Sequence, residues 1–87
     1  MSEMADTSSE SMEDLVRYIA GSLVASPDQI GVRSNRFGNT IEVRLTVAPE
    51  EMGKVIGRQG KIARAIRAVL AASAAKQGVR VSLDIDD

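Results

Sequence analysis

The clearest pattern in the chain runs from residue 41 to residue 47, where aliphatic and polar residues alternate strictly as Ile-Glu-Val-Arg-Leu-Thr-Val. Successive side chains of a β-strand point to opposite faces, so this period of two is typical of a strand with one buried and one wet face. A weaker apolar pattern precedes it at residues 29–37, and Phe-Gly-Asn-Thr at 37–40 is a turn signal. We therefore expect a short strand joined to residues 41–47 in an antiparallel hairpin.

Residues 15–24 instead repeat aliphatic side chains at helical spacing, three to four positions apart. Ser11 followed by Asp14 resembles a capping box, and Ser-Pro at 26–27 ends the pattern, so we expect an amphipathic helix that begins at Ser11. The ten residues before it include three acids and three serines and almost nothing large and apolar. We expect residues 1–10 to form a disordered acidic tail and residues 11–87 to form the folded domain.

Two further helices are predicted on either side of a turn bounded by Gly57 and Gly60. Ala-Pro-Glu-Glu at 48–51 is typical of a helix start, because proline suits the first turn and carboxylates there complement the helix dipole. This short helix is expected to stop at Gly57. A longer, alanine-rich helix is expected from Lys61 to Gln77, closed by Gly78. We expect its apolar face to carry Ile62, Ile66 and Val69, with Lys61, Arg64 and Arg67 across from them.

A second alternating segment, residues 79–85, predicts a third strand. The predicted order is therefore helix, strand, strand, helix, turn, helix, strand. Such an order indicates an α+β fold in which helices pack on one face of a three-stranded sheet.

The turn Gly57-Arg58-Gln59-Gly60 carries the clearest candidate chemistry. Glycine at both ends permits positive φ and removes the Cβ that would keep another backbone away. The helix that follows aims free N–H groups and a partial positive charge at the same place, which favours a phosphate. Basic residues surround the turn at Lys54, Arg58, Lys61, Arg64 and Arg67. An ordinary helix–helix connection, in which the glycines serve geometry alone, is the alternative interpretation.

Composition narrows the possible functions. The chain has 87 residues, a net charge of −1, no cysteine and no histidine, which excludes thiol chemistry, a histidine base and zinc sites built on these residues. The net charge hides a separation, because residues 52–83 carry seven basic and no acidic residues. Local field steers a polyanion more than net charge does. No apolar run approaches the ~20 residues that span a bilayer, so we expect a cytoplasmic protein without membrane contact.

The residues Val-Ile-Gly-Arg-Gln-Gly-Lys-Ile at 55–62, with Ala-Ile-Arg at 65–67, resemble the signature of a KH domain. The predicted αββααβ order is similar to the type II arrangement, and the chain's size resembles the small bacterial single-KH proteins of the KhpA family. The resemblance implies a loop that clamps about four nucleotides of single-stranded RNA beside an apolar groove. Carried over to this chain, the RNA-binding residues would be Gly57, Arg58, Gln59, Gly60, Lys54, Lys61, Arg64, Val55, Ile56 and Ile62.

The resemblance further implies a non-enzymatic RNA chaperone or post-transcriptional regulator, linked to cell elongation and envelope homeostasis. It implies a homodimer, a heterodimer with a KhpB (Jag)-type KH protein, or both, and no cofactor, metal or small-molecule substrate. Two readings stay open beside it. Arg64 and Arg67 are equally compatible with a solvated helix face, and the whole chain is compatible with a protein-interaction subunit whose RNA contact is incidental. A nucleotide-binding enzyme is disfavoured, because the Gly-x-x-x-x-Gly-Lys-Ser/Thr phosphate loop is missing.

Overall fold

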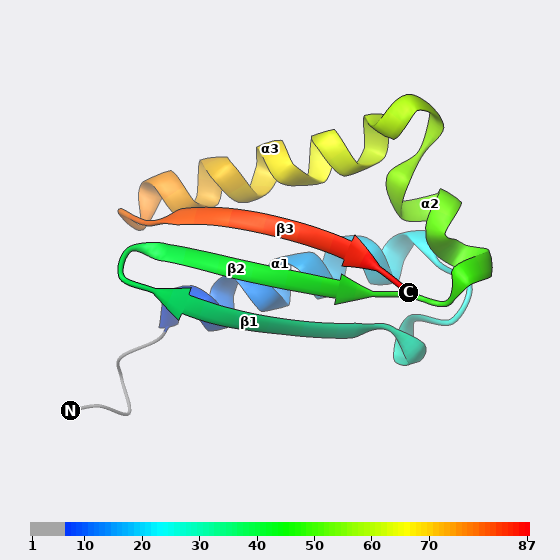
Figure 1. Cartoon of the computed structure of the whole chain (residues 1–87), viewed down its shortest axis with the longest axis horizontal. Helices are drawn as coiled ribbons and strands as arrows, with labels where there is room; N and C mark the ends of the chain where they lie inside the picture. Colours follow the sequence, from blue (N-terminus) through cyan, green and yellow to red (C-terminus); the bar gives the residue numbers. More distant parts are fainter. Residues whose placement is uncertain (1–6) are drawn as a thin grey trace.

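The computed structural model describes residues 7–87 and arranges them as a three-stranded sheet covered on one face by helices (Figure 1). Single turns of 3₁₀ helix at Pro27–Gln29, Pro49–Glu51 and Arg58–Gly60 join the longer elements. The resulting αββααβ order is the predicted type II KH arrangement, which is confirmed. In chain order the helices and strands are α1 (Thr7–Leu23), β1 (Gly31–Phe37), β2 (Thr40–Thr46), α2 (Met52–Ile56), α3 (Lys61–Lys76) and β3 (Arg80–Asp86).

Helix α1 begins four residues earlier than we predicted. Residues 7–10, which we assigned to a disordered tail, are helical, and Ser9 is buried in line with Met12, Val16 and Ala20. The stripe thus continues one turn further toward the N-terminus, but a small polar residue occupies that turn. A pattern of apolar residues does not reveal a buried serine, so the predicted helix began only at Ser11. Residues 1–6 of the predicted tail lie outside the described residues.

The sheet order is β1-β2-β3, with β1 antiparallel to β2 and β2 parallel to β3. Phe37 pairs with Thr40 across the tight turn, so the predicted hairpin is confirmed. A parallel pair requires a crossover connection, and α2 and α3 supply it. The central strand β2 buries Ile41, Val43 and Leu45 against the helices while its alternate residues stay exposed, as the strict alternation predicted.

The buried face of α3 overlaps the one we predicted at Ile66, with Ile62 half-buried beside it, but does not include Val69. Val69 is 47% exposed, whereas Ala63, Ile66, Leu70 and Ala74 are buried. These four residues lie three to four positions apart and so form one stripe. Alanines at both ends of the stripe allow α3 to approach α1 and the sheet closely. The prediction placed Val69 in the stripe where the neighbouring Leu70 belongs, and it left out the two alanines.

Glu51 is a buried acid that fixes the start of α2. Its carboxylate accepts hydrogen bonds from the amides of Ala25 (2.9 Å) and Ser26 (3.3 Å) and forms an ion pair with Lys54 at 2.8 Å. The hydrogen bond from Lys54 is the largest of the effects that lower the pKa of Glu51. We predicted Glu51 as a partner of the helix dipole, but it ties the loop after α1 to the helix that leads into the glycine turn.

Candidate nucleic-acid interface

The turn between α2 and α3 has a backbone that requires glycine. Gly57 lies at φ 78°, ψ 173° and Gly60 at φ 75°, ψ 15°. The first conformation belongs to a region that is essentially reserved for glycine. Between them Gln59 also has positive φ, at 58°. Three of the four turn residues, Gly57, Gln59 and Gly60, thus have positive φ, and the turn closes with a hydrogen bond from Gly60 N to Gly57 O at 3.1 Å.

Gly57 is required for a second reason, which is close packing. A Cβ at this position would lie 2.6 Å from Cγ1 and 2.9 Å from Cβ of Ile62. Ile62 in the first turn of α3 thus packs directly on the glycine backbone, which holds the turn against the helix. At Gly60 the only close neighbour would be the flexible end of Arg64, 3.3 Å away. The two glycines are therefore not equivalent, because close packing excludes a side chain at Gly57 but not at Gly60.

Two of the predicted cations are engaged within the protein. Lys54 forms its ion pair with Glu51, and Arg64 donates from Nη1 to the main-chain oxygen of Gln59 at 2.8 Å. Arg64, in the first turn of α3, therefore stabilises the turn through this hydrogen bond. Both side chains remain exposed, and both still contribute positive charge around the turn.

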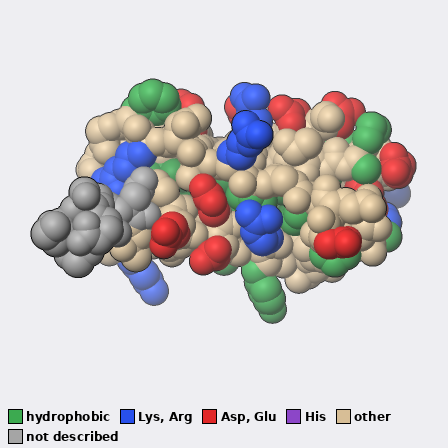
Figure 2. All heavy atoms as spheres, turned by 90° about the horizontal axis from the view of Figure 1, so that it is seen from below, with side chains coloured by type: hydrophobic (Ala, Val, Ile, Leu, Met, Phe, Trp, Pro, Cys, Tyr) green, Lys and Arg blue, Asp and Glu red, His purple; other side chains and the backbone are tan. Residues whose placement is uncertain are grey.

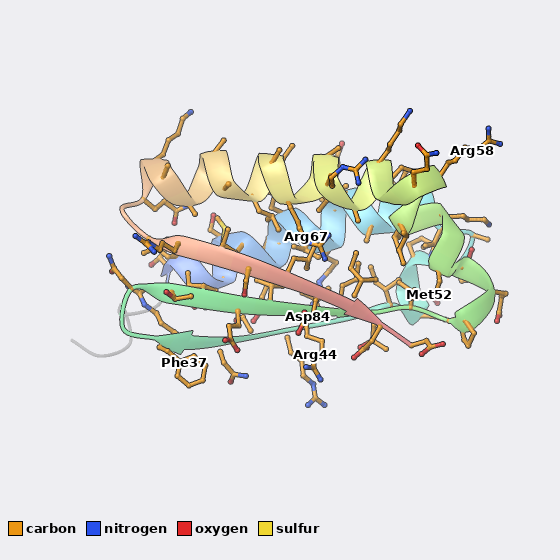
Figure 3. All side chains as sticks on the ribbon, turned by 45° about the horizontal axis from the view of Figure 1, so that its top comes forward. Phe37, Arg44, Met52, Arg58, Arg67 and Asp84 are labelled. Carbon is orange, nitrogen blue, oxygen red and sulfur yellow. The ribbon has the colours of Figure 1, made fainter. Side chains whose placement is uncertain are left out.

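The other two predicted cations are unengaged. The side chains of Arg58 and Lys61 are exposed and form no hydrogen bond or ion pair with any of residues 7–87. Figure 3 shows Arg58 projecting from the tip of the turn, away from the sheet and helices. A phosphate at this tip would meet two cations that need not break an existing contact.

The three predicted apolar residues, Val55, Ile56 and Ile62, differ in how deeply they are buried. Val55 is fully buried in the core, so it leaves no side-chain surface for RNA and serves to hold α2. Ile56 and Ile62 are half-buried and pack against that core. They retain exposed surface beside the turn, in keeping with the prediction of a groove wall or adjoining core.

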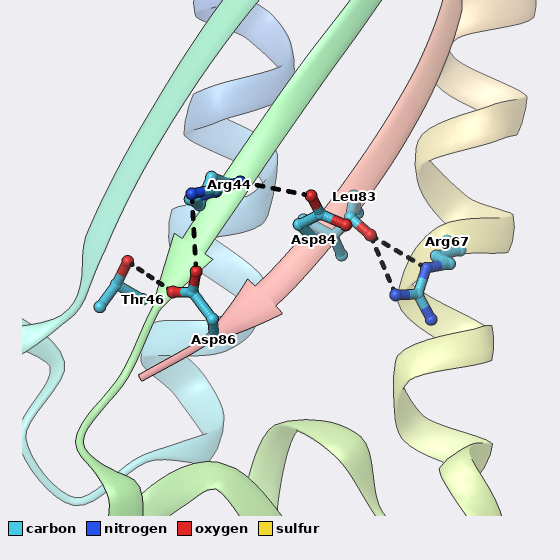
Figure 4. Close-up of polar contacts among 6 residues, drawn as sticks. All are labelled: Arg44, Thr46, Arg67, Leu83, Asp84 and Asp86. Carbon is cyan, nitrogen blue, oxygen red and sulfur yellow. Dashed lines mark hydrogen bonds and ion pairs between the residues drawn. The ribbon is translucent and has the colours of Figure 1, made fainter.

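A shallow groove lies between α3 and β3, one helical turn beyond Arg64. Its cavity measures about 250 Å³ and is lined by Arg67, Leu70, Val81, Ser82 and Leu83. Arg67 crosses it and donates two hydrogen bonds to the main-chain oxygen of Leu83 (Figure 4). The side chain is thus anchored on the outer edge of β3. A contact of Arg67 with a phosphate stays a prediction.

Our sequence interpretation missed the groove residues on β3 and Leu70 on α3. The available signal was the position of the last strand, because a strand that follows the long helix in a β-α-α-β crossover returns beside that helix.

The aspartates of β3, Asp84 and Asp86, form ion pairs with Arg44 at 3.6 and 3.7 Å. Within residues 7–87 no group of three or more His, Cys, Asp or Glu side chains is placed to hold a metal ion.

Across the described part of the chain, no helix has both the length and the apolar character that a membrane crossing needs.

A larger open hollow of about 840 Å³ lies around the start of β1, and none of its lining residues belongs to the glycine turn. The candidate interface therefore combines the turn, with unpaired Arg58 and Lys61, and the groove between α3 and β3.

Both the sequence and the fold are similar to those of known proteins. A family model described as the KH domain of KhpA and KhpB matches residues 13–85. The RNA-binding protein KhpA of Halalkalibacterium halodurans is 47% identical over 76 residues, which cover 87% of this chain and 100% of that protein. The RNA-binding protein KhpA of Clostridium acetobutylicum is 49% identical over 74 residues, which cover 85% of this chain and 99% of that protein.

An Era variant from Aquifex aeolicus, bound to GDP and aluminium fluoride, superposes with a TM-score of 0.64 over 85% of this chain and 29% of its own, at 20% identity. At that identity the likeness shows the fold alone. The family match covers nearly all of the described domain, and the two relatives align over essentially their whole length. The chain belongs to the KhpA/KhpB KH-domain family.

Proposed function

We propose that the chain binds single-stranded RNA, with the turn Gly57–Gly60 contacting the phosphate backbone and the bases lying in the groove between α3 and β3. The observation that carries this proposal is the glycine-only conformation of Gly57, packed on Ile62, with unpaired Arg58 and Lys61 at its tip. A backbone without Cβ atoms lets a phosphate approach closely, and the N-terminus of the 16-residue helix α3 adds favourable dipole charge.

The expected affinity is modest. Base stacking on aromatic side chains contributes roughly 1–3 kcal/mol per base, and the groove lining contains no aromatic residue. Electrostatic contact with phosphates should therefore supply much of the binding, which makes it sensitive to salt. The family is one of binding proteins, so the prediction that the chain is not an enzyme is confirmed.

In the cell we propose an RNA chaperone or post-transcriptional regulator that acts in the cytoplasm, as a homodimer or paired with a KhpB (Jag)-type protein. The family model that spans both KhpA and KhpB, and relatives called RNA-binding proteins, support this role. A link to cell elongation and envelope homeostasis follows from the family resemblance and forms part of the same proposal.

A protein-interaction subunit is the second candidate, and one observation favours it. The outward side of α3 exposes a run of small apolar residues that the fold does not use. Helices pack closely where such residues meet, so this side suits a second helix. The residues are Ala65, Ala68, Val69 and Ala72.

The test replaces Arg58 and Gln59 together by aspartate. Aspartate tolerates positive φ better than most residues, so the fold should survive, while two negative charges repel phosphates. We expect crosslinking to cellular RNA to be lost. The matched control replaces Lys76 and Gln77 by aspartate, an identical change in net charge at the opposite, exposed end of α3.

Unchanged crosslinking of the loop variant, with its fold verified by circular dichroism, would contradict RNA binding through this turn. If the loop variant loses RNA but still pairs with its protein partner and supports growth, the interaction subunit is the better description. Loss of crosslinking in both variants would indicate that overall charge, and not this turn, governs RNA contact.

A further inference from the structure

Both aromatic side chains of the protein are exposed. Phe37 is 62% and Tyr18 75% exposed, although aromatic side chains commonly dominate a core. Phe37 ends β1 at the hairpin, and Figure 3 shows it projecting from the face of the sheet that the helices leave open, the same face from which Arg44 projects. Its position on a defined strand fixes which residues surround it.

The register of the sheet places unpaired cations on this open face. Phe37 pairs with Thr40, and Thr40 pairs with Arg80, so the phenylalanine and this arginine lie in one row, two strand spacings or about 10 Å apart. Arg33 lies on the same face about 13 Å along β1. The side chains of Arg80 and Arg33 form no hydrogen bond or ion pair with any of residues 7–87.

The acids of this face are mostly neutralised. Asp84 and Asp86 form ion pairs with Arg44, which leaves Glu42 as the one acid between the two free arginines in the described sheet. The open face thus combines an exposed aromatic ring at the hairpin with one cation across the sheet and another along β1.

We propose that the open sheet face, with Phe37, Arg80 and Arg33, is a second contact site for single-stranded RNA. Phe37 stacks beneath one base, and the two arginines contact phosphates on either side of it. The inference rests on the proposed RNA-binding function and extends it to a separate surface. Stacking on an aromatic ring tolerates any base, so the site adds affinity without adding sequence preference.

The surroundings of Phe37 favour RNA over a protein partner. Its neighbours on the open face are polar, namely Asn35, Thr40, Glu42 and Ser82. Figure 2, seen from the side of β1, shows hydrophobic side chains scattered among polar and charged atoms on that side of the molecule. A protein interface needs a desolvated apolar centre, whereas a stacked base needs one ring and nearby cations.

The site lies away from the glycine turn, since the hairpin and the α2–α3 turn are at opposite ends of the molecule (Figure 1). A short RNA that fills the turn and groove should therefore not reach Phe37, but a longer one should. This difference in reach separates the two sites experimentally.

The experiment measures binding of the full-length protein to two oligouridylates at low salt by fluorescence anisotropy, one of about four nucleotides, the length a KH loop clamps, and one of about twelve. Phe37→Ala should weaken the longer RNA about fivefold or more and leave the shorter unchanged. Arg80→Gln should act in the same direction. Tyr18→Ala is the matched control, because it removes the other exposed aromatic side chain, which lies on α1, and should change neither affinity.

A second variant reads the contact directly. The chain has no tryptophan, so Phe37→Trp introduces a single fluorophore, whose emission should be quenched by the longer RNA and not by the shorter. Tyr18→Trp should show no quenching with either RNA. The quenching assay remains informative if Phe37→Ala is poorly folded.

Equal affinity of wild type and Phe37→Ala for the longer RNA, or no quenching of Phe37→Trp, would overturn the second site while leaving RNA binding by the turn intact. Wild-type protein that binds neither RNA would overturn the proposed function and this site together. A change in self-association of Phe37→Ala, seen by sedimentation with RNA affinity unaltered, would identify the face as a protein contact and also overturn the proposal.

Discussion

The guanidinium group of Arg67 on α3 donates two hydrogen bonds to the main-chain oxygen of Leu83 on β3, from Nε at 3.2 Å and from Nη2 at 2.9 Å. Only one edge of β3 pairs with β2, so this oxygen lies on the unpaired edge (Figure 4). A fork of two donors on one acceptor fixes the distance between α3 and β3. Arg67 therefore sets the width of the groove that it crosses.

Replacement of Arg67 by alanine should lower the free energy of unfolding by about 1 kcal/mol, because two hydrogen bonds to a partly buried oxygen are lost. Urea denaturation followed by circular dichroism measures this. Arg80→Ala is the control, since the Arg80 side chain has no partner within residues 7–87, and its effect should stay within about 0.5 kcal/mol. Equal effects of the two substitutions would show that the Arg67 contact contributes nothing specific.

Gly57→Ala should be more destabilising than Gly78→Ala, although both glycines have positive φ, 78° and 73°. A Cβ at Gly78 would meet nothing within 4 Å, so that variant carries conformational strain alone, on the order of 1 kcal/mol. At Gly57 the new Cβ would also overlap Ile62, at 2.6 Å. We expect an additional loss of about 1–3 kcal/mol from overpacking.

Thermal or urea unfolding of both glycine variants provides the measurement. The double variant Gly57→Ala with Ile62→Ala should recover only part of the steric loss, because the contact with the Cβ of residue 62 remains, and the backbone strain persists. Identical stabilities for Gly57→Ala and Gly78→Ala would mean that Ile62 moves aside without cost, and that packing does not constrain this turn.

Much of the fold was predictable because it depends on local patterns. The alternation at residues 41–47 and the glycines at 57, 60 and 78 specify a strand, a turn and a cap through short-range chemistry alone. The roles of Glu51 and Arg67 were not predictable in the same way. Their partners, Ala25 and Leu83, are 26 and 16 residues distant, so the contacts exist only once the chain has folded.

The candidate site shows the same difference between features set by local sequence and features set by tertiary contacts. The residue types around the turn indicated where positive charge would gather, but sequence spacing gave no sign that Lys54 pairs with a buried acid or that Arg64 donates to Gln59. Sequence identified the turn and its charge. Which cations remain available to a ligand depends on tertiary contacts that no periodic pattern encodes.

The stability of the fold should fall in acid partly through Glu51. Its pKa in the folded protein lies below the ordinary value of 4.5, chiefly because of the hydrogen bond from Lys54. A lowered pKa means that the ionised carboxylate stabilises the fold fully above pH 4.5, and that this contribution is lost as the pH falls through the folded-state pKa.

Glu51→Gln should therefore destabilise the protein near neutral pH and show a smaller further loss below pH 4.5 than wild type does. Glu50→Gln is the control, since Glu50 is exposed and has no hydrogen bond or ion pair within residues 7–87. Urea midpoints measured from neutral pH to about one unit below 4.5 supply the comparison. Parallel curves for wild type and Glu51→Gln would show that Glu51 is not the group responsible.

The salt dependence of RNA binding should distinguish free cations from engaged ones. Each phosphate neutralised on a single strand changes the slope of log affinity against log salt by about 0.7. Arg58 and Lys61 have no internal partner in the described chain, whereas Lys54 is held 2.8 Å from Glu51. We expect Arg58→Ala and Lys61→Ala each to reduce the slope by up to about 0.7, and Lys54→Ala to reduce it clearly less. Titrations of one oligonucleotide at several salt concentrations give the slopes. Since Lys54 and Lys61 differ in internal pairing and not in charge, equal slope changes for the two would show that RNA displaces Glu51 from Lys54.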